Sequence, residues 1–236
     1  MRRLELADLH HTDLVGEEPS DCFAVTMLIG QGKTNQAGKL RFSSFMRNKM
    51  VEVCPVGCLA MYLFSSKWYD VKVVRAPTCG TEAINYDTHC KAMDAAFSAC
   101  RVVVSAKTHA ARRAGAQFAE VGDAAASHIA RAGIWNVSVM ESAYLTNIPL
   151  EVSRVHAGFD KGGGGFFLRR DVAVPEELLE KVFPWAQKWL SAVEEGTLDG
   201  HHVEKNIAAR GFLRLLLRLR AVVVQDAVAL RRQHPH

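Results

Sequence analysis

The stretch from Lys107 to Leu150 constrains this chain most, because it carries four side chains suited to phosphate chemistry. It reads KTHAARRAGAQFAEVGDAAASHIARAGIWNVSVMESAYLTNIPL. The imidazole of His109, the guanidinium of Arg112 and the indole of Trp135 can donate hydrogen bonds to a phosphate, and the phenol of Tyr144 can attack one. His109 and Arg112 are three positions apart, so they would share one face of a helix.

Helix signals divide this stretch into short elements. Thr108 is a suitable N-cap for a helix that runs to about Val121 and stops at Gly122. Asp123 is a suitable N-cap for a second helix, which Gly133 would close. The stretch is therefore predicted to be helical rather than extended.

The C-terminal part of the stretch predicts a turn, a helix and then a loop. Trp135 would lie in the turn after the second helix, and a third short helix would carry Tyr144 and end before Pro149. Four glycines at 162–165 follow. They predict a flexible loop rather than a phosphate cradle, because no Lys-Ser/Thr pair follows them.

The N-terminal half predicts a β-hairpin followed by helices. A strand is expected at 22–29, and the turn residues GQGKTNQAG lead to a partner strand at 39–43. Lys33 would lie at the hairpin tip, either contacting phosphate or simply solvated. Helices are expected at 55–64, as part of the core, and at 86–100. The fold class predicted is mainly α with a small antiparallel sheet.

The C-terminal third predicts two further helices around a linker. Pro175 would open a helix whose apolar face includes residues of 182–190, and a long helix is expected over 204–230. A composition change at 196–203 indicates a linker between a domain at 1–195 and the start of a helical region at 204–236. The long helix carries three arginines spaced by four, which would either follow DNA phosphates, contact another domain or face solvent: Arg210, Arg214 and Arg218.

Charge is segregated along the chain more than its total suggests. The net charge is +4 and the sequence pI is near 8.8, which is only mildly basic. Lysine and arginine nevertheless occur without acids over 31–50, 95–119 and 205–225. Such segregation indicates a basic surface for a polyanion, although solvated faces are the alternative. The predicted DNA-contacting residues are Lys33, Lys39, Arg41, Lys107, Arg112 and Arg113.

Other classes of site and location receive no support from the sequence. The six cysteines lack the paired spacing of a zinc site, so no metal and no cofactor is predicted. The N-terminus has no apolar run typical of a signal peptide, and no window approaches 18 apolar residues. Partners in a membrane are therefore not expected.

Six short motifs carry a resemblance to a known family. They are GKTN at 32–35, CPVGCLAMYLF at 54–64, WYD at 68–70, KTHAARR at 107–113, GIWN at 133–136 and YLTNIP at 144–149. The order and spacing of the His-x-x-Arg pair, the Trp and the Tyr resemble the catalytic box of tyrosine recombinases. The surrounding motifs are similar to one eukaryotic branch, which joins Crypton-type recombinases to the second DNA-binding domain of the large subunit of the budding-yeast centromere-binding complex. The similarity covers roughly 1–190.

The resemblance implies a recombinase-like catalytic fold and a role for each matching residue. It assigns Tyr144 as nucleophile, Arg112 as the second phosphate-clamping arginine, His109 as its partner, Trp135 as the residue that positions the phosphate, and Lys33 as general acid. The family's first arginine would lie upstream of Leu4. We therefore expect no DNA recombination from this chain, since losing one such clamp costs on the order of 10²–10³ in rate.

Three functions are compatible with these observations. The first is a DNA-binding module that contacts backbone phosphates, in the nucleus and with duplex DNA as its partner. The second is the C-terminal part of an active Crypton-type recombinase. The third is a purely structural interaction domain. A homodimer or higher oligomer on DNA is compatible with the first two, and the sequence specifies neither the target site nor the host process.

Overall fold

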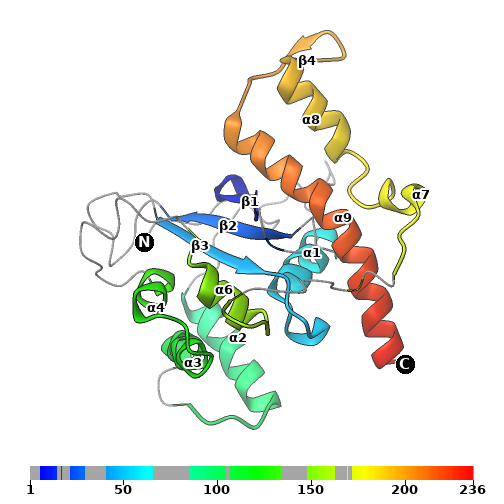
Figure 1. The fold of residues 1–236 in the computed structure, drawn as a ribbon. Coiled ribbons are helices and arrows are strands. Elements are labelled where there is room, and N and C mark those ends of the chain that lie inside the picture. The colour runs from blue at the N-terminus through cyan, green and yellow to red at the C-terminus, as the bar shows by residue number, and fades with distance from the viewer. Residues whose placement is uncertain are drawn as a thin grey trace.

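The structure is a computed structural model of the chain, and it combines many helices with a three-stranded sheet and a two-stranded hairpin (Figure 1). It describes residues 6–14, 17, 22–29, 41–65, 86–104, 107–133, 148–162, 169 and 172–235. The side chains of 41, 107 and 108 are outside this description. The predicted class, mainly α with a small antiparallel sheet, is confirmed.

The main sheet has three antiparallel strands in the order β1-β2-β3. These strands are β1 (Leu9–Asp13), β2 (Phe23–Ile29) and β3 (Arg41–Met46), and a short 3-10 helix, η1 (Leu6–Asp8), precedes them. The pairing of β2 with β3 confirms the predicted hairpin, although β3 begins two residues later than expected. Strand β1 adds a third strand, and Thr26 Oγ1 donates to its backbone at the carbonyl of His10 (3.2 Å).

Three helices form the main core against this sheet. They are α1 (Pro55–Ser65), α8 (Ala186–Glu195) and α9 (Ile207–Gln233), and α1 and α9 confirm predicted helices. Helix α9 crosses the whole molecule and packs on α8, on β1 and on α1 (Figure 1). Its N-cap, Asn206, accepts the N–H of Ala209 (3.0 Å). Among the described residues, no helix combines the length and apolar character needed to cross a membrane.

The single helix predicted after Pro175 is wrong, because the chain breaks in the middle of its apolar face. Helix α7 (Glu176–Leu179) is short, and α8 begins after the break. Phe183 has a φ of 53° and Pro184 follows it. A residue before proline is disfavoured in the α region, so the helix cannot continue through this point. The turn buries the Phe183 ring in the core, and Arg220 donates to its carbonyl (2.9 Å).

Residues 196–203 form a small β-hairpin between α8 and α9. Strands β4 (Thr197–Leu198) and β5 (His201–His202) pair antiparallel. The two turn residues, Asp199 and Gly200, have φ values of 49° and 82°, as a two-residue hairpin of type I′ needs. The division of the chain into two regions at this segment stays a prediction.

Four helices form a second group on the β3 side of the sheet (Figure 1). They are α2 (Tyr86–Ala99), α3 (Lys107–Val121), α4 (Ala126–Ala132) and α6 (Leu150–His156). The first three confirm predicted helices, whereas α6 was not predicted. Helix α6 joins the group to the sheet, because it packs on β3 and on α3. The Ser153 hydroxyl lies 3.3 Å from that of Ser44 on β3.

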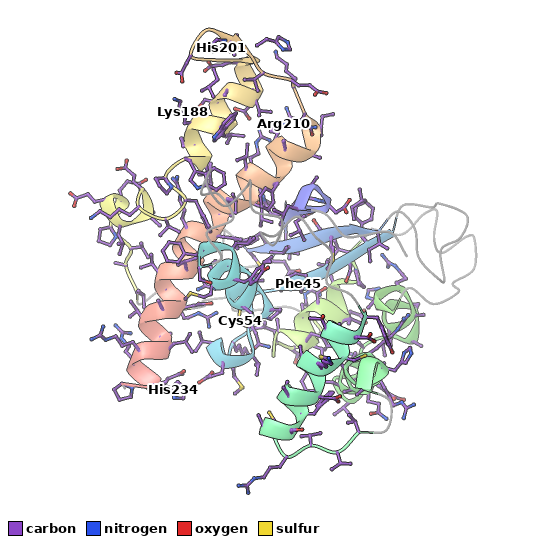
Figure 2. All side chains as sticks on the ribbon, turned by 180° about the vertical axis from the view of Figure 1, so that it is seen from behind. Phe45, Cys54, Lys188, His201, Arg210 and His234 are labelled. Atoms are coloured by element: carbon purple, nitrogen blue, oxygen red, sulfur yellow. The ribbon has the colours of Figure 1, made fainter. Side chains whose placement is uncertain are left out.

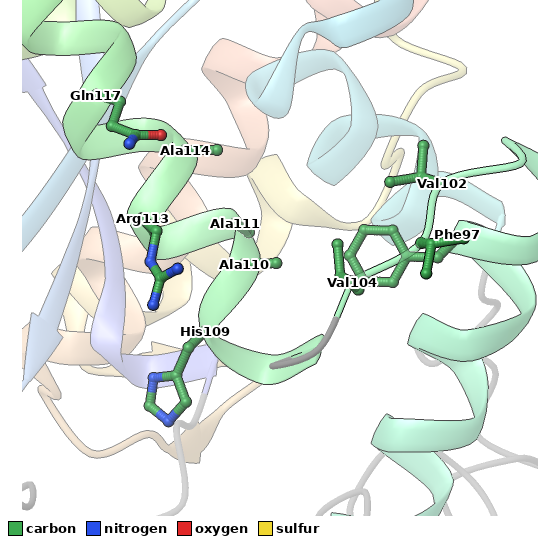
Figure 3. A pocket seen from close by; sticks show the side chains of 10 residues that line it. Phe97, Val102, Val104, His109, Ala110, Ala111, Arg113, Ala114 and Gln117 are labelled. Carbon is green, nitrogen blue, oxygen red and sulfur yellow. The ribbon is translucent and has the colours of Figure 1, made fainter.

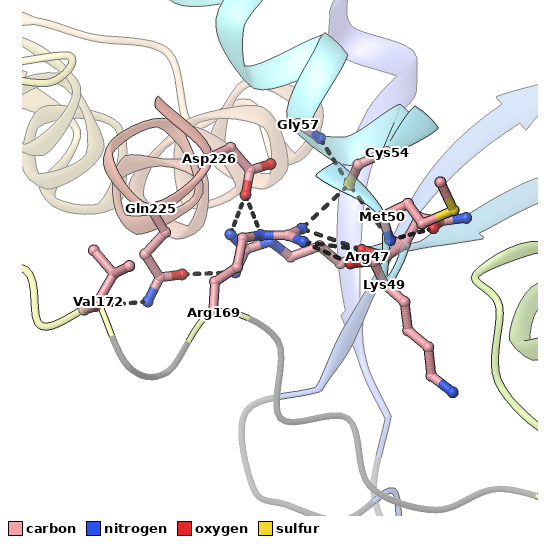
Figure 4. Close-up of polar contacts among 10 residues, drawn as sticks. Arg47, Lys49, Met50, Cys54, Gly57, Arg169, Val172, Gln225 and Asp226 are labelled. Atoms are coloured by element: carbon pink, nitrogen blue, oxygen red, sulfur yellow. Dashed lines mark hydrogen bonds and ion pairs between the residues drawn. The ribbon is translucent and has the colours of Figure 1, made fainter. Parts of the chain in front are cut away.

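A buried polar cluster joins the end of β3 to α9 (Figure 4). The Asp226 carboxylate, 1% exposed, accepts from Arg47 Nη2 (2.5 Å) and lies 2.5 Å from Arg169 Nε. Burial lowers the pKa of Arg47, and Asp226 opposes that shift. The Cys54 sulfur accepts the backbone N–H of Gly57 (3.3 Å), the third residue of α1, so it acts as the helix cap. The cluster fixes the relative positions of β3, α1 and α9.

Candidate nucleic-acid interface

Helix α3 ends in a backbone turn centred on Asp123. The φ of Asp123 is 57°, its N–H donates to the carbonyl of Glu120 (2.8 Å), and that of Ala124 donates to Ala119 (3.0 Å). This is the Schellman pattern, in which one left-handed residue reverses the chain after a helix. Asp123 was predicted to cap α4, and that prediction is wrong. Its backbone is committed to ending α3, and Ala125 is the N-cap residue of α4.

A side chain from α6 supplies the polar partner at the start of α4. Glu151 Oε2 accepts the N–H of Ala125 (2.8 Å), and Ala125 makes no side-chain cap of its own. The same carboxylate lies 3.9 Å from His128 Nδ1. Gly133 ends α4 as the sequence predicts. The α3–α4 unit is therefore held by α6, a helix that the sequence analysis missed although Pro149 with an acid two residues later is a recognised opening.

Helix α6 also fixes the position of α3. His156 Nε2 donates to the carbonyl of Gly115 (2.8 Å), and its ring stacks on Phe118 with centroids 6.2 Å apart. Gly122 lies directly against Val155, where a Cβ would overlap the valine methyl groups. These contacts lie on the α6 side of α3, in its second half.

The predicted site residues on α3 point to different places. Arg112 Nη2 donates to the carbonyl of Gly133, at the end of α4 and two positions before Trp135 in the sequence. His109 and Arg113 instead line a pocket of about 420 Å³ (Figure 3). The structure therefore brings His109 together with Arg113, one helical turn away, rather than with Arg112.

The pocket lies between the C-terminal end of α2 and the first turns of α3. Its wall includes Phe97 and Val102 from the α2 side, and Gln117 follows His109 and Arg113 at successive four-residue steps on α3 (Figure 3). Phe97 and Val102 were not predicted to line a pocket. The available signal was the run of three valines at 102–104, which follows the helix without an alternating pattern.

The remaining predicted residues lie outside the described residues in whole or in part. Only the backbone is described for Arg41, which pairs with Ile29 at the start of β3, and for Lys107, which begins α3. The residues that lie wholly outside are Lys33, Lys39, Trp135 and Tyr144. Their predicted roles in phosphate contact and in catalysis stay predictions.

Two arginines of α9 pair with acids of the same chain. Arg214 Nη2 lies 2.6 Å from Glu194 on α8, and Arg218 Nη2 lies 2.5 Å from Asp13 on β1. Figure 2 shows Arg210, at the exposed start of α9, beside the α8 end of the molecule. Two of the three predicted stripe residues, Arg214 and Arg218, therefore form ion pairs at the surface with acids from other elements.

Metal-binding geometry is a separate question from charge. In the part of the chain that the structure describes, no three His, Cys, Asp or Glu side chains converge as a metal site would need. The candidate interface is defined by its cations. It consists of the first half of α3, with Arg112 and Arg113 exposed, and the positive end of the helix dipole adds to their charge.

These features define a class of protein, an α+β domain that presents a cationic helix suited to a polyanion. Its sequence matches, over residues 1–76 and 65–236, the family described as Centromere DNA-binding protein complex CBF3 subunit, domain 2, and the chain belongs to this family. Membership implies centromere DNA binding as the general function. No curated protein and no solved structure matches the chain. The predicted kinship with the centromere-binding domain is confirmed, whereas kinship with Crypton-type recombinases stays a prediction.

Proposed function

We propose that this domain binds duplex DNA through backbone phosphates, with the first half of α3 as part of the contact surface. Membership of the centromere DNA-binding family is the observation that carries the proposal. The position of Arg112 and Arg113 on an exposed helix, in a stretch without acids, supports the location. Phosphate contacts of this kind orient a protein on DNA without reading its sequence.

The surroundings of α3 suit this role physically. A phosphate contact needs cations that are held in place yet remain exposed to the ligand. The stacking of His156 on Phe118 and its hydrogen bond to Gly115 fix the helix from one side. The hydrogen bond of Arg112 to Gly133 orients its guanidinium, and the side chain is exposed.

Salt-dependent binding tests the proposal. We would measure the affinity of the chain for a random 30-base-pair duplex across a salt series, and compare an Arg112→Ala/Arg113→Ala variant. The matched control is Arg214→Ala/Arg218→Ala on α9, which removes the same charge from arginines that pair with acids of this chain. Circular dichroism at the assay temperature would establish that each variant is folded.

The two variants should differ clearly in affinity and in its dependence on salt. We expect the α3 variant to weaken binding and to flatten the slope of log K against log salt by roughly 1–2, because each lost phosphate contact contributes about 0.9. The α9 control should keep most of the slope. An equal loss of slope in both variants would mean that the contact surface lies elsewhere or that binding depends only on net charge. No binding at low salt would mean that this chain does not bind duplex DNA.

A second candidate is DNA cleavage through a phosphotyrosyl link, as in Crypton-type recombinases. The order of His109, Arg112, Trp135 and Tyr144 favours it, and Arg112 reaches the carbonyl of Gly133, two positions before Trp135 in the sequence. A duplex with a nicked strand would trap the covalent link. A covalent product that forms with the wild-type chain and is lost in Tyr144→Phe would establish cleavage. We expect the wild-type chain to give no such product.

The same reasoning gives the location and assembly that we propose. A domain that binds centromeric DNA acts in the nucleus at the kinetochore, and a fluorescent fusion found throughout the cytoplasm would contradict that. A homodimer or higher oligomer on DNA remains part of the proposal. If this oligomer does not form, sedimentation of the complex with duplex DNA would show a single chain on the duplex.

A further inference from the structure

The pocket between α2 and α3 is built by the way α2 ends. Arg101 has a φ of 55°, its N–H donates to the carbonyl of Ser98 (3.0 Å), and the N–H of Val102 donates to Phe97 (2.9 Å). This is the same Schellman pattern that ends α3, and it brings the residue after the turn beside the last turn of the helix. The chain therefore returns along Phe97, and the run of valines at 102–104 becomes one wall of the pocket (Figure 3).

The apolar wall is exposed rather than part of a core. Val102 and Val103 are 47% and 98% exposed, and α2 buries none of its side chains. Ala110 and Ala114 line the α3 side, where larger side chains would fill the space. The pocket thus offers apolar contact area that the described part of the fold does not use.

The rim of the pocket carries one fixed positive charge, on Arg113, and two further polar side chains. His109, Arg113 and Gln117 lie four residues apart on α3, and among the described residues that line the pocket none is acidic. Figure 3 shows His109 and Arg113 on the same side of α3. An occupant that matches this site must combine an apolar group with nearby negative charge, because a basic rim repels cations and favours anions.

We propose that this pocket binds a short segment of a partner protein, in which one large apolar side chain is flanked by Asp or Glu. The apolar side chain would fill the space between Phe97 and the alanines of α3, and the flanking carboxylates would meet Arg113 and His109. This inference does not rest on the proposed DNA binding, although Arg113 belongs to both surfaces.

Synthetic peptides would test this directly. The probes are fluorescein-labelled peptides with two acids on each side of a central Leu, Phe or Trp, measured by fluorescence polarisation on the full chain. Two comparison sets replace the central residue by Ser or the acids by Lys. We expect the acidic apolar peptides to bind at least about ten-fold more tightly than either comparison set, which corresponds to about 1.4 kcal/mol.

Two variants of the chain assign the binding to the pocket. Ala114→Leu fills the space at an exposed helix position, and Arg113→Glu reverses the rim charge. The matched controls are Ala208→Leu and Arg210→Glu, at exposed positions in the first turns of α9. Each pocket variant should weaken peptide binding at least about ten-fold, and each control should leave it unchanged.

Three results would overturn the inference. One is that none of the acidic apolar peptides binds better than its comparison set. Another is that binding persists in Ala114→Leu and Arg113→Glu. The third is that a six-nucleotide single-stranded DNA binds more tightly than the peptides and loses affinity in Ala114→Leu, which would make the pocket a nucleotide site. Because Ala114 is not one of the residues assigned to duplex DNA, loss of peptide binding alone in Ala114→Leu distinguishes this site from the proposed function.

Discussion

Replacing the buried carboxylate of Asp226 by an amide tests how the central polar cluster holds the fold. Asp226 is 1% exposed, and its Oδ1 lies 2.5 Å from Arg47 Nη2 and 2.5 Å from Arg169 Nε. The two arginine side chains are only 14% and 9% exposed. Asp226→Asn keeps the shape of the side chain and one acceptor, but it leaves both guanidinium groups buried without this opposite charge.

The expected loss of stability is large, because the remaining arginine charges cannot be hydrated unless the fold opens. Removing one partner of a buried ion pair typically costs about 3–5 kcal/mol. In a domain of this size each kcal/mol lowers the midpoint of thermal unfolding by about 2–4 °C. We therefore expect Asp226→Asn to lower Tm by about 6–20 °C.

Calorimetry on matched variants would measure this effect. The control is Asp199→Asn, which breaks an exposed pair with Lys188 (2.9 Å) and should change stability by no more than about 1 kcal/mol. Adding Arg169→Met to Asp226→Asn removes one unpaired buried charge and should recover part of the loss. If Asp226→Asn unfolds at the same temperature as the control, the carboxylate does not balance these arginines and the reasoning fails.

Three further predictions concern other parts of the fold. Burial lowers the pKa of His11 below its ordinary value of 6.5, so the folded state resists its protonation and stability should fall as pH drops below about 6.5; His11→Gln should flatten that decline in Tm. Gly122→Ala should cost about 1–3 kcal/mol in chemical denaturation, because its Cβ would overlap Val155, and a smaller loss would mean that α6 can shift. Burial raises the pKa of Cys22 to about 11, so iodoacetamide at pH 8 should modify the exposed Cys58 first, and equal rates by peptide mapping would contradict the burial of Cys22.

Most regular elements could be predicted because their signals are local. Apolar side chains at helical spacing identified α1, α2 and α9, and β-branched residues around a glycine-rich turn identified the pairing of β2 with β3. The capping signal of Thr108 placed the start of α3 to within two residues. These patterns depend on neighbours within a few positions, which a sequence displays directly.

Several element boundaries could not be predicted because they depend on backbone conformation. Asp123 is a good N-cap residue, yet its left-handed conformation ends α3 instead, and both uses are open to an aspartate. Phe183 continues an apolar helical pattern, but it adopts φ of 53° before Pro184 and breaks the helix. A favourable local signal decides an element only when no tertiary contact favours another conformation.

The candidate sites, too, were predicted from the sequence only in part. The order of cationic and phosphate-directed residues in the stretch that contains His109 and Arg112 is visible in the sequence. The sequence does not show which of these side chains lie together, because Arg112 turns to Gly133 while His109 lines the pocket with Arg113. The wall of that pocket comes from residues beyond the end of α2, where the direction of the chain depends on a single left-handed residue.

The sequence by itself determined the family, the fold class and the segregation of positive charge in this protein, because all three are carried by residue types and their spacing. Only the tertiary structure decided which charges are balanced. Arg218 on α9 meets Asp13 on β1, and Arg47 and Arg169 meet Asp226, across separations along the chain that no local pattern spans. A cation's availability to DNA or to a partner depends on the acids that folding places beside it, and folding places such acids beside Arg214 and Arg218 of α9 and in the central cluster.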